Sequence, residues 1–243
     1  MEMPRMEVKE NAPLAPLTTL GVGGNARFFV RAESIHDVEA AVAFSREKGR
    51  ALFVLGGGSN VVISDRGWDG LVLQIGIPGI DEHATGRFNV GAGVNWDAFV
   101  AHAVSRNYSG IECLSGIPGR VGGTPVQNVG AYGQEVSQTI TSLLAFDLAE
   151  NRVRELSAAE CGFSYRTSIF NTSHRGRYII LRVSYGLDPE GKPQLQPGDA
   201  QADGAEEPCR QSLDQSERRL QVVDRDAQRD EGHPRDNGEG TGP

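Results

Sequence analysis

The sequence predicts an α+β fold followed by a polar tail, and three observations support this prediction. Short apolar segments typical of strands occur together with two segments that have helical spacing. Two glycine-rich segments separate these elements, one at 56–60 and one at 115–133. From Pro197 onward the composition becomes polar and charged, and the apolar periodicity ends.

The first helix is predicted to begin after Ser34 and to end near Gly49. Ser34 is a good capping residue, and Asp37 stands three positions later, as in a capping box. The apolar residues of this helix fall on one face. These residues are Ile35, Val38, Ala41 and Val42.

A second helix is predicted after Asn95, whose side chain can cap it. Its buried face is expected to consist of Trp96, Phe99, Val100, Ala103 and Val104. Strands are predicted where short apolar runs are bounded by turn residues. They lie at 26–31, 51–55, 61–63, 71–75, 88–93, 140–147, 152–156 and 178–187. The last three are expected to form one closing sheet.

The last part of the chain differs from the rest in charge. Residues 197–243 carry 12 acidic and 6 basic residues, and so account for −6 of the net charge of −8. Too little apolar surface is available there to offset the entropy that folding would cost. We therefore expect a disordered tail at 189–243, a folded domain at 19–188 and a separate N-terminal segment at 1–18.

Composition excludes several classes of function. No basic face with interleaved aromatic residues indicates a nucleic-acid partner. No apolar run reaches the roughly 18 residues of a membrane span, and the polar N-terminus is not typical of a secretory signal. Cys113, Cys161 and Cys209 have no paired spacing, which is typical of a reducing cytoplasm. The histidines show no metal-ligand spacing, so we expect a cytoplasmic protein without metal, membrane or nucleic acid.

The first glycine-rich segment is Gly56-Gly57-Gly58-Ser59-Asn60, between two predicted strands. Backbone N–H groups at a glycine turn can bind an anion such as phosphate, and Ser59 and Asn60 can add side-chain donors. The segment is not a Walker loop, because no Gly-Lys-Ser/Thr follows. It is not a dinucleotide fingerprint either, because it opens a strand instead of a helix. A tight hairpin turn is the alternative interpretation.

The second segment, Ser115 to Gly133, holds six glycines and two prolines in nineteen residues. Neither a core strand nor a helix would carry so many glycines. We interpret it as a folded loop whose backbone passes close to a ligand. Its hydrogen-bonding side chains are Ser115, Thr124, Gln127 and Asn128. Together the two segments predict a large cofactor that is held at two points.

Two arginines are open to two interpretations each. Arg166 follows Tyr165 among small and aromatic residues, where an arginine can stabilise a developing oxyanion or enolate. The alternative is a surface arginine beside a structural tyrosine. Arg120 lies inside the second glycine-rich segment, where it could reach a phosphate or be exposed to solvent.

Four segments, taken in order, resemble the UDP-N-acetylenolpyruvoylglucosamine reductase (UDP-N-acetylmuramate dehydrogenase) family of bacterial cell-wall synthesis. They are 19–24, 55–60, 115–133 and 165–170, and the resemblance covers about residues 13–190. It implies a two-lobed FAD-binding module of the vanillyl-alcohol-oxidase (PCMH) type. The implied lobes are about 19–76 and 77–188.

The resemblance also implies an activity. FAD, bound non-covalently, would carry hydride from NADPH to the enolpyruvyl group of UDP-N-acetylglucosamine-enolpyruvate in peptidoglycan synthesis. NADPH and the UDP-sugar would be the small-molecule partners of a monomer. Arg166 would be the catalytic residue that polarises the enolpyruvyl carboxylate, and Tyr165 would bind substrate beside it. The implied cofactor-binding residues are Gly56, Gly57, Gly58, Ser59, Asn60, Ser115, Gly116, Ile117, Pro118, Gly122, Gly123, Thr124, Gln127, Asn128, Gly130, Ala131 and Tyr132.

The tail departs from the family. The family carries a serine proton donor in a Ser-Ala-Gly-Ser-Phe-type motif and a later glutamate, and this sequence matches neither. A shifted reading frame and a genuine tail on a shortened protein are both open explanations. We therefore expect this chain to bind FAD weakly and to reduce substrate poorly or not at all. Another flavin oxidoreductase of the same module and a non-catalytic flavin-binding protein are the alternative functions.

Overall fold

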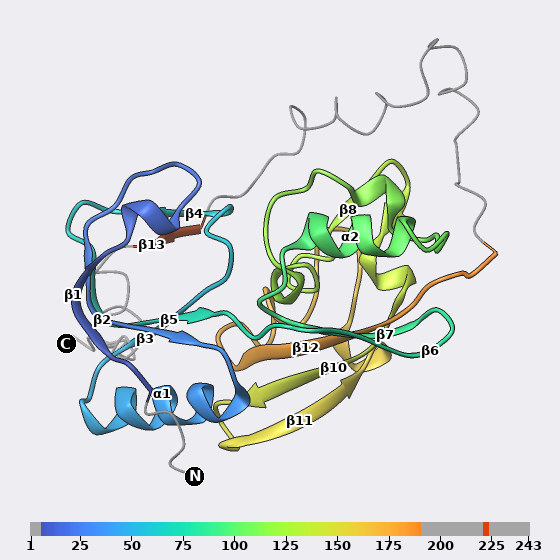
Figure 1. The fold of residues 1–243 in the computed structure, drawn as a ribbon. Coiled ribbons are helices and arrows are strands. Elements are labelled where there is room, and N and C mark those ends of the chain that lie inside the picture. Colours follow the sequence, from blue (N-terminus) through green and yellow to red (C-terminus); the bar gives the residue numbers. More distant parts are fainter. Residues whose placement is uncertain (1–5, 191–220, 224–243) are drawn as a thin grey trace, which may run out of the picture.

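The structure is a computed structural model that describes residues 6–190 and 221–223. Two sheets lie next to each other in two lobes (Figure 1). All strands of the first sheet fall between Lys9 and Ile75, and its order is β1-β2-β5-β3. All strands of the second fall between Ile80 and Gly186, and its order is β11-β10-β12-β7-β6. The domain boundaries at 18 and 188 stay predictions.

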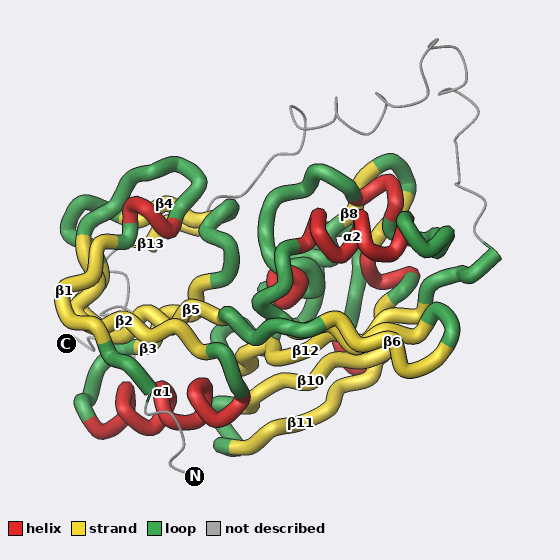
Figure 2. Tube along the Cα trace, viewed as in Figure 1, coloured by secondary structure: helices red, strands yellow, loops and turns green. Residues whose placement is uncertain are grey.

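The first sheet is mixed. It consists of β1 (Lys9–Pro13), β2 (Asn25–Ala32), β3 (Leu52–Leu55) and β5 (Trp68–Ile75). β1 runs antiparallel to β2, whereas β2 and β3 run parallel to β5. A short 3-10 helix, η1 (Ala15–Leu17), follows β1, and helix α1 (Ile35–Glu47) packs on β2 and β5 (Figure 2).

Helix α1 has the predicted capping box. The Asp37 N–H donates to Ser34 Oγ at 3.1 Å, and the Ser34 N–H donates to Asp37 Oδ2 at 2.9 Å. Val38, Ala41 and Val42 are buried as predicted, but Ile35 is 37% exposed. Ile35 is the first helical residue. Because a helical side chain lies over the turn before its own Cα, this one extends past the helix end.

Helix α2 (Trp96–Val104) has the predicted cap, because the Ala98 N–H donates to Asn95 Oδ1 at 2.9 Å. The predicted face is buried except for Val104, which is 46% exposed. Val104 directly follows the buried Ala103. Neighbouring helical residues point about 100° apart, so the side chain of Val104 leaves the buried stripe.

The second sheet is antiparallel throughout. It consists of β6 (Ile80–Ala84), β7 (Arg87–Gly91), β10 (Ile140–Asp147), β11 (Arg152–Ser157) and β12 (Tyr178–Gly186). The prediction that its last three strands form one sheet is confirmed. β8 (Gly130–Ala131) and β9 (Gln134–Glu135) form a separate two-stranded sheet, and both come between β7 and β10 in the sequence.

Four further 3-10 helices connect these strands, and loops and short helices cover the second sheet on the side of α2 (Figure 2). They are η2 (Glu112–Leu114), η3 (Val121–Gly123), η4 (Val136–Gln138) and η5 (Ala159–Cys161). η3 packs on β12 and β7, so the second glycine-rich segment rests on the centre of this sheet.

The two lobes meet at a pair of glycines and share the larger of two buried clusters, while the smaller cluster lies within the first lobe. A Cβ at Gly93 would stand 2.2 Å from the carbonyl carbon of Gly76, so backbone meets backbone at this point. One buried cluster extends from Val30 of the first sheet to Phe88 and Trp96 of the second lobe. The lobes are therefore joined by packing as well as by the chain.

Strand β4 (Val61–Ile63) belongs to neither large sheet. It pairs in parallel with β13 (Gln221–Val223), so three residues of the predicted disordered tail form a strand. This pairing gives the backbone groups of β4 partners that an isolated strand would lack. The remaining tail residues, 191–220 and 224–243, lie outside the described residues, and so does Cys209.

Candidate cofactor and substrate site

The first glycine loop, 56–60, connects β3 to β4, and these strands lie in different sheets and do not pair. The hairpin interpretation is therefore wrong. Gly58 has a φ of +69°, and a Cβ there would stand 1.9 Å from the Leu17 carbonyl oxygen. The Thr19 N–H also donates to the Gly58 carbonyl oxygen at 3.0 Å. Packing against the segment after β1 thus requires a glycine at 58 and fixes the loop.

The structure brings the two glycine-rich segments together. Ser59 Oγ donates to the Pro118 carbonyl oxygen at 3.1 Å, across 59 positions of sequence. A Cβ at Gly57 would stand 3.0 Å from Gly119 Cα, so the two backbones are in close contact. Both segments therefore contribute to one surface. Their contact with a cofactor stays a prediction.

Two glycines on this surface are not explained by the protein around them. At Gly56 and Gly123 the backbone is outside the left-handed region, and a Cβ would meet no described atom within 4 Å. Gly122 differs, because a Cβ there would stand 2.6 Å from Ala92 Cβ. In the first loop, Asn60 Oδ1 is buried and has no hydrogen-bond partner among the described residues. The open backbone at Gly56 and Gly123 leaves room for a group that lies against these loops.

Thr124 was predicted to bind a ligand through its side chain, but its hydroxyl is used inside the protein. The residue is only 3% exposed. Its Oγ1 donates to the Val121 carbonyl oxygen at 2.9 Å and lies 3.1 Å from the Tyr185 hydroxyl on β12. These bonds anchor the second segment to the sheet. A contact of Thr124 with a ligand would have to come from its backbone.

Asn128 is also directed inward, and it links the second segment to the third. It is fully buried and has a φ of +44°. Its Nδ2 donates to Glu135 Oε2 at 2.7 Å and to the Ser164 carbonyl oxygen at 3.0 Å. Its Oδ1 accepts from the Ser137 N–H at 3.1 Å. The amide is thus satisfied by protein, and sequence reasoning gave no role to the Glu135 carboxylate that accepts from it.

Tyr165 and Arg166 form the tip of a tight turn. The backbones of Ser164 and Thr167 exchange two hydrogen bonds of 3.0 Å, and Arg166 has a φ of +53°. Tyr165 is 79% exposed, whereas Arg166 is half-buried, with its guanidinium carbon 5.9 Å from the tyrosine ring centroid. Asn171 Nδ2 donates to the Arg166 carbonyl oxygen at 3.2 Å. The backbone of the tip is therefore fixed while the tyrosine faces solvent.

A second bond ties this turn to the glycine-rich segment. Ser168 is fully buried, and its Oγ donates to the Val126 carbonyl oxygen at 2.6 Å. Together with the bond from Asn128 to Ser164, it places the turn next to the second segment. The sequence predicted all three segments as ligand-binding, but the side chains that connect them were not recognisable from their spacing.

The start and the end of the second glycine-rich segment are held by local contacts. Asp97 Oδ1 on α2 accepts from Ser115 Oγ at 2.8 Å and from the Gly116 N–H at 2.7 Å, which fixes the start of the second segment. Tyr132 has a φ of +49° in the turn between β8 and β9. Cofactor contacts of these residues and of Ile117, Gln127, Gly130 and Ala131 stay predictions.

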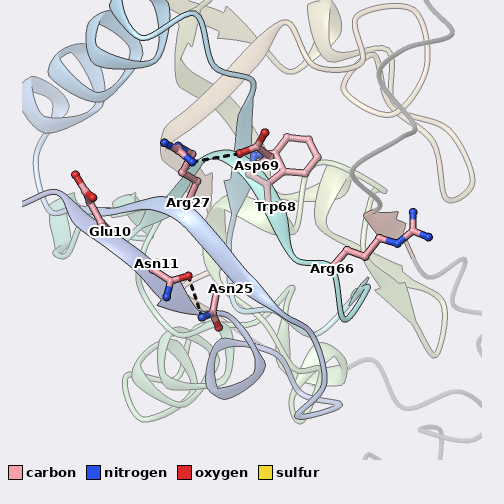
Figure 3. Close-up of a pocket in the computed structure, with 7 residues that line it drawn as sticks. All are labelled: Glu10, Asn11, Asn25, Arg27, Arg66, Trp68 and Asp69. Carbon is pink, nitrogen blue, oxygen red and sulfur yellow. Dashed lines mark hydrogen bonds and ion pairs between the residues drawn. The ribbon is translucent and has the colours of Figure 1, made fainter.

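A polar surface hollow elsewhere shares no residue with these three segments (Figure 3). It is lined by Glu10, Asn11, Asn25, Arg27, Arg66, Trp68 and Asp69. Its side chains pair with one another, because Asn25 Nδ2 donates to Asn11 Oδ1 at 3.1 Å and Arg27 lies 4.0 Å from Asp69. The hollow therefore gives no argument for a ligand.

Within 6–190 and 221–223, no group of three or more His, Cys, Asp or Glu residues could hold a metal ion. No helix in this part of the chain is long and apolar enough to cross a membrane.

Comparison with known proteins identifies the family. The model of the FAD binding domain family matches residues 26–157, which is more than half of the chain. The chain belongs to the FAD binding domain family. This match, together with the solved structures below, confirms the predicted α+β FAD-binding module.

Individual relatives carry a more specific name than the family model does. The chain is 49% identical over 181 residues to the UDP-N-acetylenolpyruvoylglucosamine reductase of Thermobifida fusca, covering 73% of this chain and 50% of that protein. It is similar to the crystal structure of the enzyme of that name from Thermus caldophilus, with a TM-score of 0.62 and 28% identity over 76% of this chain and 62% of that one. The resemblance seen in the sequence is thereby confirmed.

A more distant solved structure shares the fold. It is 6-hydroxy-D-nicotine oxidase from Arthrobacter nicotinovorans, with a TM-score of 0.51 and 19% identity over 67% of this chain and 36% of that chain. The chain spans about half the length of the curated relatives it matches. Activity, substrates and partners are for this reason treated as proposals.

Proposed function

We propose that this chain provides the FAD-binding part of a UDP-N-acetylenolpyruvoylglucosamine reductase, which makes UDP-N-acetylmuramate with NADPH. The observation that carries the proposal is the junction of three distant segments. Ser59 bonds to Pro118, and Asn128 bonds to the Ser164 carbonyl group beside Arg166. The Thermobifida fusca enzyme of this name, which is 49% identical to the chain over the matched residues, supports the same function.

The glycine loops have the properties needed to hold FAD. The open positions at Gly56 and Gly123 would let a large cofactor lie directly on the backbone. N–H groups of 56–60 would bind the pyrophosphate, and the segment Ser115–Tyr132 would line the adenine and flavin side. Bound FAD supplies the hydride chemistry between NADPH and the enolpyruvyl double bond.

Arg166 would bind and polarise the enolpyruvyl carboxylate. A planar guanidinium matches a carboxylate in two parallel hydrogen bonds and offsets negative charge that develops as the double bond is reduced. The fixed turn keeps this arginine in place, and the exposed Tyr165 is free to contact the substrate. We propose that the bound flavin takes up hydride from NADPH in this arrangement.

The test is the visible spectrum of the purified chain with FAD, first alone, then with NADPH, then with the enolpyruvyl UDP-sugar. Bleaching of the flavin band by NADPH and its recovery on adding the sugar in the absence of oxygen would support a working reductase. Bleaching without recovery would support hydride uptake alone. A chain that takes up no FAD would contradict the proposal.

A non-catalytic flavin-binding protein is the second candidate, because the matching family model describes an FAD binding domain and no reaction. In that case the flavin spectrum would appear but would not respond to NADPH. A different oxidoreductase of the same module would bleach with another donor instead. We further propose a cytoplasmic monomer with small-molecule partners, which light scattering of the purified chain would test for oligomeric state.

A further inference from the structure

Arg120 is a cation whose surroundings offer no counter-charge. Its Nη1 donates to the Gly93 carbonyl oxygen at 2.5 Å, and its Nε is buried without a hydrogen-bond partner among the described residues. In the same part of the chain, no carboxylate oxygen lies within 4.0 Å of this guanidinium. Burial and the neighbouring Arg31 both lower the pKa of Arg120. Keeping this positive charge partly buried therefore costs free energy, and no described side chain offsets that cost.

Other partly buried arginines show what is missing here. Arg177 lies 2.6 Å from Asp147, and Arg50 lies 3.0 Å from Asp69. Even the exposed Arg31, whose charge acts on Arg120, lies 3.1 Å from Glu33. Among the described arginines that are half-buried, Arg50, Arg154 and Arg177 are paired with carboxylates, whereas Arg120 and the proposed substrate-binding Arg166 are not. Arg120 is the one of these two that lies at the junction of the glycine loops.

The position of Arg120 points to the missing anion. It belongs to the second glycine-rich segment, and a Cβ at Gly57 in the first loop would stand 3.5 Å from its Cγ. Backbone at Gly56 is open on the same loop. We propose that Arg120 supplies the positive charge that binds a pyrophosphate group of the dinucleotide cofactor, where the two loops meet. This inference rests on the proposed FAD binding and assigns the charge to one side chain.

The chemistry selects this ligand class. A pyrophosphate carries two negative charges and many acceptor oxygens, so it can take the remaining guanidinium donors and the loop N–H groups at the same time. The isoalloxazine ring has no such charge. Arg120 should therefore discriminate between flavins with and without phosphate, while a residue that only supports the loop would affect both alike.

The first experiment compares FAD with riboflavin, which lacks phosphate. Dissociation constants are measured by quenching of flavin fluorescence for the wild-type chain, Arg120→Met and Arg120→Lys. We expect Arg120→Met to weaken FAD binding roughly 10- to 100-fold and riboflavin binding less than about twofold, with Arg120→Lys between. Equal losses for FAD and riboflavin would overturn the proposal in favour of a packing role.

Arg31→Met is the matched control, because it removes the same charge from a neighbouring residue that already has Glu33 as partner. It should change FAD binding less than about threefold. If Arg120→Met does not fold, the salt dependence of the wild-type chain gives the answer. Binding of FAD should weaken with salt and that of riboflavin should not.

A second experiment separates this inference from the proposed function. ADP and inorganic pyrophosphate are titrated into the wild-type chain and Arg120→Met by calorimetry. Binding to wild type that is lost in Arg120→Met supports the inference. FAD binding that is unchanged in Arg120→Met would overturn it and leave the proposed function intact. Failure of the wild-type chain to bind FAD, ADP and pyrophosphate would contradict both.

Discussion

The charged end of the second sheet and the junction of the glycine loops differ in how their buried charges are paired. The charge at the sheet end has several partners, whereas the one at the loop junction lacks a counter-charge among the described residues. At the sheet end, Asp147 is fully buried, and Arg177 donates to it at 2.6 Å and 3.0 Å. The N–H groups of Ala149 and Glu150 donate to it at 2.9 Å and 3.2 Å. At the loop junction, no carboxylate of the described residues pairs with Arg120.

The difference helps to separate folding from binding. A polar group that the protein satisfies completely contributes to stability and offers little to a ligand. A polar group left unpaired beside open backbone costs stability and becomes useful when a ligand supplies the partner. Removing a fully paired group at the sheet end should therefore reduce stability and leave FAD binding unchanged. A substitution at an open or unpaired position of the loop junction should weaken FAD binding with little loss of stability.

The largest loss of stability is expected at the sheet end. The hydrogen bonds from Arg177 hold the pKa of Asp147 at about 2, compared with 3.8 for an ordinary aspartate. A shift of this size corresponds to about 2–3 kcal/mol at neutral pH, which Asp147→Asn should remove. Urea unfolding measures it. Unchanged FAD binding is expected, and weaker binding in this variant would contradict the separation of the two regions.

Asn128→Asp tests a fully satisfied group inside the junction. The new carboxylate would face Glu135, whose Oε2 lies 2.7 Å from the amide nitrogen of Asn128. Repulsion and the lost donor should cost about 2 kcal/mol at pH 8 and less at pH 5, where the pair can share a proton. Unfolding at both pH values measures this. Ser137→Ala is the control, because it removes a long bond to the same Glu135 Oε2 (3.4 Å) without adding a charge and keeps the backbone N–H that Asn128 uses. A loss independent of pH would contradict the prediction.

The pH dependence of stability sharpens the role of Asp147. Its pKa is lowered in the folded state, so its contribution is present above about 4 and is lost as the pH falls through about 2. The difference between wild type and Asp147→Asn should shrink by about 2 kcal/mol between pH 5 and pH 2. Thermal unfolding across this range measures it, and a constant difference would show that Arg177 does not depress this pKa.

The smallest effect on stability is expected at Gly56. Alanine there meets no described atom within 4 Å, so the free energy of unfolding should change by less than about 0.5 kcal/mol. FAD binding should nevertheless weaken about tenfold, because the methyl group fills the space against the loop. Gly58→Ala is the contrasting control, since its left-handed φ and its contact with Leu17 should reduce stability. Full FAD affinity in Gly56→Ala would remove the main argument for a ligand at this loop.

Local signals made much of the fold predictable. The caps at Ser34 and Asn95 depend on residues only three positions apart, and both are present. Strands such as β10 and β12 are apolar enough to recognise. β1 and β6 were missed, because Lys9–Pro13 and Ile80–Ala84 are polar and mostly exposed segments that pair through their backbones.

The site was predictable as a set of segments, but the orientation of its side chains was not. Glycine clustering indicated loops that approach something closely, and the structure does bring them together. Whether Asn128 faces a ligand or Glu135 depends on contacts between residues far apart in sequence, which local pattern does not contain. The same holds for Arg120, because the absence of a nearby carboxylate arises only from the tertiary fold.

The crossing at Gly76 and Gly93 has a kinetic consequence. Because the larger buried cluster draws residues from both sheets, the face of the first sheet that this cluster covers is completed only when distant parts of the chain have met. Proteins dominated by such non-local contacts refold slowly, and loop closure precedes most of the energetic gain. Residues 6–76 expressed alone keep the smaller cluster but lose the shared one, so they should unfold at lower urea concentration than the intact chain. The intact chain should regain its near-ultraviolet signal in a phase that a bulkier residue at 76 or 93 would slow.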